Sequence, residues 1–398
     1  MRKLVIVSLF TCVGAGVVAA DPPLNRYIVH TDDDAVNEAA RQGVENHGGV
    51  VLKDFAHGGL VVLVPEQAVG PLGNIQGVVV EPDVLLHAVA QPAGKGKPSK
   101  DPPLQPDQVL PWGIDRIDAE LASSTVVVGL AAVNVVVIDT GIMKDHADLA
   151  VTGGINFVRK GRRAVKPDAW GDDHGHGTHV AGTVAALDNG IGVLGTAPRV
   201  NLYAAKVLDK TGSGFISDII DAILWSSDNG MDVINMSLGI SKDTLDQYPS
   251  TRQAFQDALD LARDSGIVIV AAAGNSGLGT DTVIYPARFA SVIAAAATDI
   301  TDARAWFSST GPDVEVAGPG VNILSTTIDG LYGFKNGTSM ASPHVAGTAA
   351  LIIASGVADT NGNGRINDEV RLVIQTTAED LGDSEWFGFG LVNAEITD

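Results

Sequence analysis

The stretch Val133-Asn134-Val135-Val136-Val137-Ile138 is apolar at five of its six positions, without alternation between polar and apolar side chains. A strand with one face in water would alternate, so this run predicts a strand that is buried on both faces. Similar apolar runs follow at residues 202–207, 233–236, 267–273 and 292–296.

Amphipathic segments separate these runs, and we expect helices near residues 177–187, 216–229, 251–265 and 339–355. Strands that alternate with helices predict a parallel sheet, because parallel neighbours need a long crossover connection. We therefore expect a three-layer α/β domain over residues 107–398, with a mostly parallel central sheet between helices.

An N-terminal module precedes this domain. Residues 26–88 follow the order strand, helix, two strands, helix, strand, which predicts a small α+β fold of the ferredoxin-like, split βαβ type. Asp32 to Asp34 bring negative charge to the start of its first helix, where the helix dipole favours it. Residues 89–106 are rich in proline, glycine and lysine, so they predict a linker that is open to proteolysis.

The first twenty residues have the pattern of a secretory signal. Arg2 and Lys3 precede an apolar stretch, and the small residues Val18-Ala19-Ala20 end it. A membrane anchor is the alternative, although the stretch is short for a bilayer span. We expect residues 1–20 to be removed and the product to be secreted without a membrane anchor. Cys12, the single cysteine, lies in this segment, so the mature chain would have no disulfide and no thiol nucleophile.

Composition excludes some classes of partner. Lys and Arg number 26 against 47 Asp and Glu, giving a net charge of −21. This balance argues against nucleic acid or an anionic membrane surface as a partner, and it favours the attraction of cations.

Two titratable side chains stand next to predicted elements. Asp139 directly follows the strand that ends at Ile138, and the carboxyl ends of parallel strands are where α/β sheets place ligands. His176 precedes a predicted helix and is flanked by glycines that leave its ring accessible. A turn or helix-capping Asp is the alternative for Asp139, and a metal site with His174 and His179 is the alternative for His176.

A hydroxyl and an amide complete the set of candidate groups. Ser339 begins an apolar helix, where the dipole favours developing negative charge, although a capping role is the simpler interpretation. Asn275 follows the run 267–273, as a turn residue or as an amide donor aimed at an oxyanion. Carboxylate, imidazole, hydroxyl and amide together form a complete hydrolase set, in the chain order Asp, His, Ser.

Three stretches resemble the active-site signatures of the subtilisin family. They are Val137-Ile138-Asp139-Thr140-Gly141, His176-Gly177-Thr178-His179-Val180-Ala181-Gly182 and Gly337-Thr338-Ser339-Met340-Ala341. The resemblance extends over residues 112–394. The module at 21–88 is similar to the family's inhibitory propeptide, and residues 89–106 correspond to the processing region.

The resemblance implies a secreted serine endopeptidase of broad specificity. Ser339 would attack the scissile carbonyl, His176 would transfer the proton, and Asp139 would orient the imidazole. Asn275 and the Ser339 backbone N–H would stabilise the oxyanion. The chain would act as a monomer on protein and peptide substrates, with its own propeptide as inhibitor and folding aid. The expected substrate-binding residues are Gly212, Ser213, Gly214, Ser237, Leu238, Gly239, Ala273 and Gly274.

Two loops are candidates for structural calcium. Residues 187–193 resemble the family's high-affinity loop, whose expected ligands are Gln108, Asp148, Leu187, Asn189, Ile191 and Val193. The second loop carries Asp359, Asn361 and Asn363 at the spacing of an EF-hand. Its twelfth position is valine, with a glutamate one residue early, so a plain polar loop is the alternative.

One residue departs from the family pattern, and two other functions are alternatives. Ile284 stands where the family often has a small residue, and it would narrow the specificity pocket. A secreted binding protein with an inactive protease fold would not need the intact set of four groups. A calcium-dependent adhesion module would rest on residues 359–369 alone.

Overall fold

The structure, a computed structural model, describes residues 23–55, 58–89, 105–159 and 161–395. The predicted signal segment 1–20 and residues 90–104 of the predicted linker lie outside them. Among the described residues, no helix has the length and apolar character needed to cross a bilayer.

A seven-stranded sheet forms the centre of the large domain, and each pair of neighbouring strands runs parallel. This confirms the expected fold class. Val135 to Ile138 are fully buried, as their lack of alternation predicted. In spatial order the strands are β14 (Val316–Pro319), β13 (Ile293–Thr298), β12 (Val268–Ala272), β10 (Val233–Met236), β6 (Asn134–Asp139), β8 (Asn201–Lys206) and β7 (Val151–Asn156).

The two outermost strands, β7 and β14, were not expected from the sequence. Strand β7 has the sequence Val-Thr-Gly-Gly-Ile-Asn and is only half buried, because it lies at the sheet edge. Strand β14 has four residues and ends in glycine and proline. Neither has the long apolar run that marked the inner strands.

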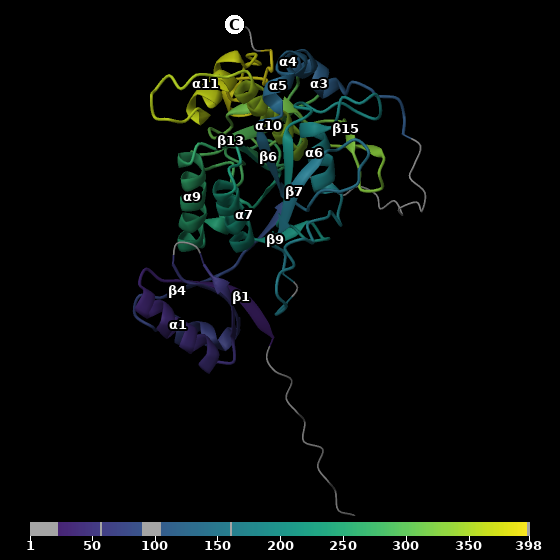
Figure 1. Cartoon of the computed structure of the whole chain (residues 1–398). Coiled ribbons are helices and arrows are strands. Elements are labelled where there is room, and N and C mark those ends of the chain that lie inside the picture. Colours follow the sequence, from purple (N-terminus) through teal and green to yellow (C-terminus); the bar gives the residue numbers. More distant parts are fainter. Residues whose placement is uncertain (1–22, 56–57, 90–104, 160, 396–398) are drawn as a thin grey trace, which may run out of the picture.

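Helices cover both faces of the sheet (Figure 1). α6 (His176–Ala185) and α10 (Thr338–Ala354) share one apolar core, and α7 (Ile216–Asp228) and α9 (Pro249–Asp264) share the other. The remaining elements of this domain are α3 (Trp112–Arg116), α4 (Ala119–Thr125), α5 (Val127–Leu130), α8 (Lys242–Leu245), α11 (Asn367–Thr377), α12 (Ser384–Phe387), β15 (Ile323–Thr326) and β16 (Tyr332–Lys335).

The N-terminal module has a four-stranded antiparallel sheet and its own apolar core (Figure 1). Its strand order is β2-β3-β1-β4, and the predicted order of elements along the chain is found. Asp33 caps the first helix through the backbone N–H groups of Ala35 and Val36. The elements are β1 (Leu24–His30), α1 (Asp34–Asn46), β2 (Val50–Asp54), β3 (Leu60–Pro65), η1 (Glu66–Ala68), α2 (Val69–Gly73) and β4 (Val79–Pro82).

The last strand of the module leaves its sheet and joins the large domain. β5 (Leu85–Ala88) lies between β9 (Ser213–Phe215) and β11 (Leu238–Gly239), antiparallel to both. The chain therefore places its own extended segment where the sequence predicted that a substrate would bind.

Candidate active site

Asp139 and His176 come from adjacent elements and meet in the interior. Asp139 ends β6, and His176 begins α6 after Gly175, whose φ of 96° suits glycine. The imidazole Nδ1 lies 2.8 Å from each carboxylate oxygen of Asp139. Both side chains are at most 1% exposed. A carboxylate in this position fixes the ring and its tautomer and stabilises an imidazolium.

Asp172 organises the start of α6, a role that sequence reasoning missed. Its carboxylate accepts hydrogen bonds from the backbone N–H groups of His174, Gly175 and Thr178, and from the Thr140 hydroxyl. It thereby ties the turn after Asp139 to the turn before the helix. The only sequence signal was its place just upstream of the histidine motif.

Ser339 lies in the first turn of α10 and is fully buried. Its hydroxyl donates to the carbonyl oxygen of Ser237 at 3.0 Å. The Nε2 atom of His176 has no hydrogen-bond partner among the described residues. The serine hydroxyl is thus turned toward the end of β10 rather than toward the imidazole while β5 occupies the cleft.

Asn275 holds the end of the segment in the cleft. Its Nδ2 donates to the carbonyl oxygen of Val89 at 2.7 Å, and its Oδ1 accepts from the backbone N–H and hydroxyl of Thr338. Thr338, which sequence reasoning missed although it stands inside the serine motif, orients the amide. The nitrogen can therefore only point into the cleft.

Backbone hydrogen bonds hold β5 on both sides. Ala88 N–H donates to Gly212 O at 2.9 Å, and Val89 N–H donates to Ser237 O at 3.1 Å. Five more of the predicted binding residues also border this segment. Ser213 and Gly214 pair with His87 and Leu86, Gly239 and Leu238 pair with His87 and Ala88, and Gly274 immediately precedes Asn275.

Ile284 packs against two of these glycines. A Cβ atom at Gly239 would lie 2.4 Å from its Cδ1, and one at Gly274 would lie 3.0 Å from its Cγ2. The backbone N–H of Ile284 also donates to the carbonyl of Ala273. Its branched side chain therefore fills space beside the segment that carries Val89.

The histidines do not gather as metal ligands. His179 Nε2 faces the carbonyl oxygens of Ile323 and Gly333, and burial keeps the pKa of this ring well below its usual value. Its role is structural. Within the described ranges, no group of three or more His, Cys, Asp or Glu side chains could hold a metal ion.

The residues predicted to bind the first calcium ion lie close together, and most of them contribute amide or carbonyl groups. Gln108 Nε2 donates to the carbonyls of Leu187 at 2.7 Å and Val193 at 3.3 Å. Asp148 is fully buried, its Oδ1 lacks a partner among the described residues, and burial raises its pKa to about 6. A buried carboxylate oxygen without a hydrogen-bond partner fits a hard cation, which takes carboxylate, amide and carbonyl oxygens as ligands.

Asn189 and Ile191 lie at the outer side of this cluster. Asn189 Oδ1 accepts from the Ile191 backbone N–H at 3.1 Å, and its Nδ2 donates to Ala147 O at 3.4 Å. The donor that faces the two carbonyls is the amide nitrogen of Gln108, so a bound cation requires the reversed amide orientation.

The second loop closes around its own backbone. Asp359 accepts from the N–H groups of Gly362 and Gly364, Asn361 accepts from Asn363, and Asn363 accepts from Arg365. Glu369, one residue before the twelfth position, accepts from Thr360 and Asn361 through Oε1. Its Oε2 is buried without a partner in the described part of the chain.

The sheet of the N-terminal module contacts α7 through charged side chains. Arg26 forms ion pairs of 2.7 Å with Asp83 and with Asp218 of α7, and Lys53 pairs with Asp218 and Asp221. The Arg26 side chain is 6% exposed. Burial lowers its pKa, but the surrounding carboxylates outweigh burial and raise it.

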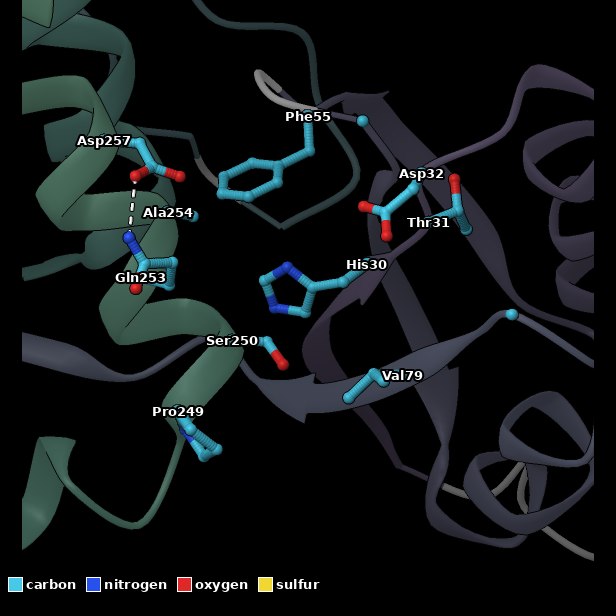
Figure 2. Close-up of a pocket in the computed structure, with 12 residues that line it drawn as sticks. His30, Thr31, Asp32, Phe55, Val79, Pro249, Ser250, Gln253, Ala254 and Asp257 are labelled. Carbon is cyan, nitrogen blue, oxygen red and sulfur yellow. Dashed lines mark hydrogen bonds between the residues drawn. The ribbon is translucent and has the colours of Figure 1, made fainter.

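A second contact reaches α9 beside a cavity of about 380 Å³, shown in Figure 2. Glu81 accepts from the backbone N–H groups of Ser250 and Thr251 at the start of this helix. His30 Nε2 lies 3.2 Å from the Thr251 hydroxyl and 3.7 Å from Glu81. Burial lowers the pKa of His30, against the attraction of Glu81 and Asp32.

Comparison with known proteins identifies the family. The model of the subtilase family, Peptidase S8, matches residues 131–390. The chain belongs to the subtilase family. This subtilase is 48% identical to subtilisin DY of Bacillus licheniformis over 291 residues, which are 72% of this chain and 98% of that protein. It is 40% identical to subtilisin E of Bacillus subtilis (strain 168) over 399 residues, 98% of this chain and 95% of the relative.

The match to an alkaline protease of Alkalihalobacillus alcalophilus is 44% identical over 288 residues, 72% of this chain and 70% of that protein. The subtilase is a serine endopeptidase, a hydrolase whose substrates are proteins.

Proposed function

We propose that this subtilase cleaves internal peptide bonds through Asp139, His176 and Ser339, by way of an acyl-enzyme. Ser339 attacks the carbonyl carbon, His176 takes the serine proton and returns it to the leaving amine, and Asp139 stabilises the imidazolium. Asn275 and the Ser339 N–H receive the oxyanion. The observation that carries this assignment is the 2.7 Å contact between Asn275 Nδ2 and a peptide carbonyl, that of Val89.

The same contact supports self-processing after Val89. A chain that lies in the cleft with this carbonyl on the oxyanion donor is positioned like a substrate whose next bond, Val89–Ala90, is cut. The N-terminal module, residues 21–88, would then act as inhibitor and folding aid, and residues 1–20 would direct secretion. Recognition through backbone hydrogen bonds supports broad specificity, because every peptide offers the same N–H and C=O groups.

Replacement of the nucleophile tests this proposal. Ser339→Ala should accumulate as a precursor that lacks only the signal segment, in a host without other proteases. The peptidase activity of this variant should be about 10⁶-fold lower than that of the unmodified enzyme. Normal processing of this variant would show that another enzyme makes the cut. A fluorophosphonate probe should label the unmodified enzyme at Ser339, whereas an inactive binding protein would remain unlabelled.

We further propose that Gln108, Asp148, Leu187, Asn189, Ile191 and Val193 hold a structural calcium ion. The unpartnered Oδ1 of buried Asp148 supports this assignment. Asp359, Asn361 and Asn363 are the proposed ligands of a second ion, and the unpartnered Oε2 of Glu369 adds a ligand that the sequence did not suggest. Both sites lie apart from the reacting groups, so calcium would stabilise the fold without entering the chemistry.

Chelation tests the calcium proposal. An ion that binds only the native state stabilises it by about 4.1 kcal/mol at a thousandfold excess over Kd. EDTA should therefore shorten the half-life at elevated temperature and leave the initial rate at moderate temperature nearly unchanged. Asp148→Asn should reproduce this effect, and Asp359→Asn tests the second loop separately. An unchanged half-life would contradict structural calcium.

A further inference from the structure

A cavity with more cationic than acidic side chains is lined by residues from the segments 156–159, 163–173 and 206–210. Its volume is about 670 Å³. Its cationic residues are Arg159, Arg163, Lys166, Lys206 and Lys210, and its acidic residues are Asp173 and Asp209. Five cations against two carboxylates leave a local charge of +3, in a chain whose net charge is −21.

Most of these cations have no carboxylate partner. Lys206 pairs with Asp173 at 2.7 Å, and Asp209 accepts from the backbone and hydroxyl of Thr211. The carboxylates of the described residues form ion pairs with none of the other four cations. Arg159 instead donates to two backbone carbonyls, those of Arg163 and Leu52. The cavity therefore offers positive charge that the fold itself does not neutralise.

A smaller cavity of about 280 Å³ connects this site to the substrate cleft. It shares Val158, Arg159 and Asp209 with the larger cavity, and it is also lined by Leu85 of β5 and Gly214 of β9. Val89 lies at the oxyanion donor, so Leu85 occupies the fifth position before the proposed cut. A substrate in the place of β5 would bring its fifth and earlier residues to the entrance of the cationic cavity.

Removal of the N-terminal module makes Arg159 available. In the precursor, its Nη2 donates to Leu52 O at 3.2 Å, and Leu52 belongs to β2 of that module. Asp218 also lines the smaller cavity, where it repels anions once Arg26 has left. The charge balance of the two connected cavities nevertheless stays positive.

We propose that this cavity recognises carboxylate side chains of the substrate at the fifth and earlier positions before the cleaved bond. The proposal extends the proposed endopeptidase site to a preference for acidic segments. Arg163, Lys166 and Lys210 are exposed, whereas Arg159 is half-buried and Lys206 is buried. The attraction that each exposed cation exerts is therefore modest and is screened by salt. Such charges act mainly on encounter and specificity.

The test compares two internally quenched peptides that differ only at the fifth and sixth positions, Glu-Glu against Gln-Gln. The mature enzyme should cleave the glutamate peptide with a kcat/KM about three- to tenfold higher at low ionic strength. The ratio should approach one in 0.5 M NaCl, where the Debye length falls to about 4 Å. The double variant Arg163→Gln, Lys166→Gln should lower the low-salt ratio to about one.

Arg162→Gln is the matched control, because Arg162 lies in the same exposed segment but does not line the cavity. It should keep the preference. A shorter peptide with four residues before the bond should be cleaved equally by all variants. A ratio of one or less in the unmodified enzyme, or an unchanged ratio in the double variant, would overturn the proposal. Failure to cleave the short peptide would overturn the proposed catalytic site as well.

Discussion

Strand β5 and the sheet of the same N-terminal module contact the peptidase domain through different kinds of interaction. β5 is held by backbone hydrogen bonds to β9 and β11, the groups that any extended peptide can offer. The sheet contact depends on particular side chains. Arg26 pairs with Asp218, and Glu81 accepts from the first N–H groups of α9.

This difference implies that self-cleavage and release of the cut module depend on different contacts. A substrate can compete for the cleft, but it cannot replace the charged contact with α7 and α9. We therefore expect the backbone contact to set where the chain cuts itself. The charged contact should set how long the cut module stays bound.

Breaking the charged contact should have the largest effect. Arg26→Ala leaves Asp83 buried without a cation and leaves Asp218 paired with Lys53 alone. Removing one partner of a buried ion pair typically costs about 3–5 kcal/mol. The cut module should dissociate about 100-fold faster or more. The measurement is the lag between self-cleavage and full peptidase activity.

Arg41→Ala is the control for this variant, since Arg41 pairs with Asp54 on the exposed surface of the module. Exposed pairs contribute little, so its lag should stay near that of the unmodified chain. Equal lags for Arg26→Ala and Arg41→Ala would contradict a role for the buried pair.

A second prediction concerns the residue directly before the cleaved bond, where the backbone contact leaves the choice of side chain to the pocket. Ile284 fills space beside Gly239 and Gly274, so the unmodified enzyme should favour valine over phenylalanine at this position. Ile284→Ala should shift the phenylalanine-to-valine ratio of kcat/KM by about tenfold, because one methylene in an apolar pocket changes specificity by roughly 10- to 200-fold. The ratio is measured with paired peptides that differ only at the residue before the cleaved bond. If the ratio does not change in Ile284→Ala, Ile284 lies outside the pocket.

The smallest expected effect concerns pH. Burial lowers the pKa of His30 in the docked module, so protonation is easier after release. The contribution of His30 to docking is therefore full above its ordinary pKa of about 6.5 and is lost as the pH falls below that value. Burial raises the pKa of Asp83 to about 6, so this carboxyl partly offsets the loss. Once self-cleavage is complete, native chromatography at pH 7.5 and 5.5 should show a several-fold faster separation in acid.

His30→Gln keeps a hydrogen-bonding group near Thr251 but cannot take up a proton in this range. Its separation should depend less on pH than that of the unmodified chain. The same acid response in both chains would assign the effect to other groups at the interface.

The hydrophobic pattern alone predicted the inner strands, as continuous apolar runs, and the helices between them, as amphipathic segments. The run before Asp139 contains only apolar side chains between Val135 and Ile138, and this is sufficient to predict a strand buried on both faces. The edge strands β7 and β14 escaped prediction because fewer neighbours bury them or because they are short. Their place depends on pairing with β8 and β13, which no local pattern encodes.

The sequence by itself determined which groups can perform the chemistry, since motif and chain order selected Asp139, His176, Asn275 and Ser339. Only the tertiary structure decided what supports and surrounds them. Thr338 orients the Asn275 amide through bonds to its oxygen, and Asp172 joins two turns that are distant in sequence. The cationic cavity is likewise assembled from separate segments. Hydrogen bonds and electrostatic fields depend on distance in space, whereas sequence patterns record only neighbours along the chain.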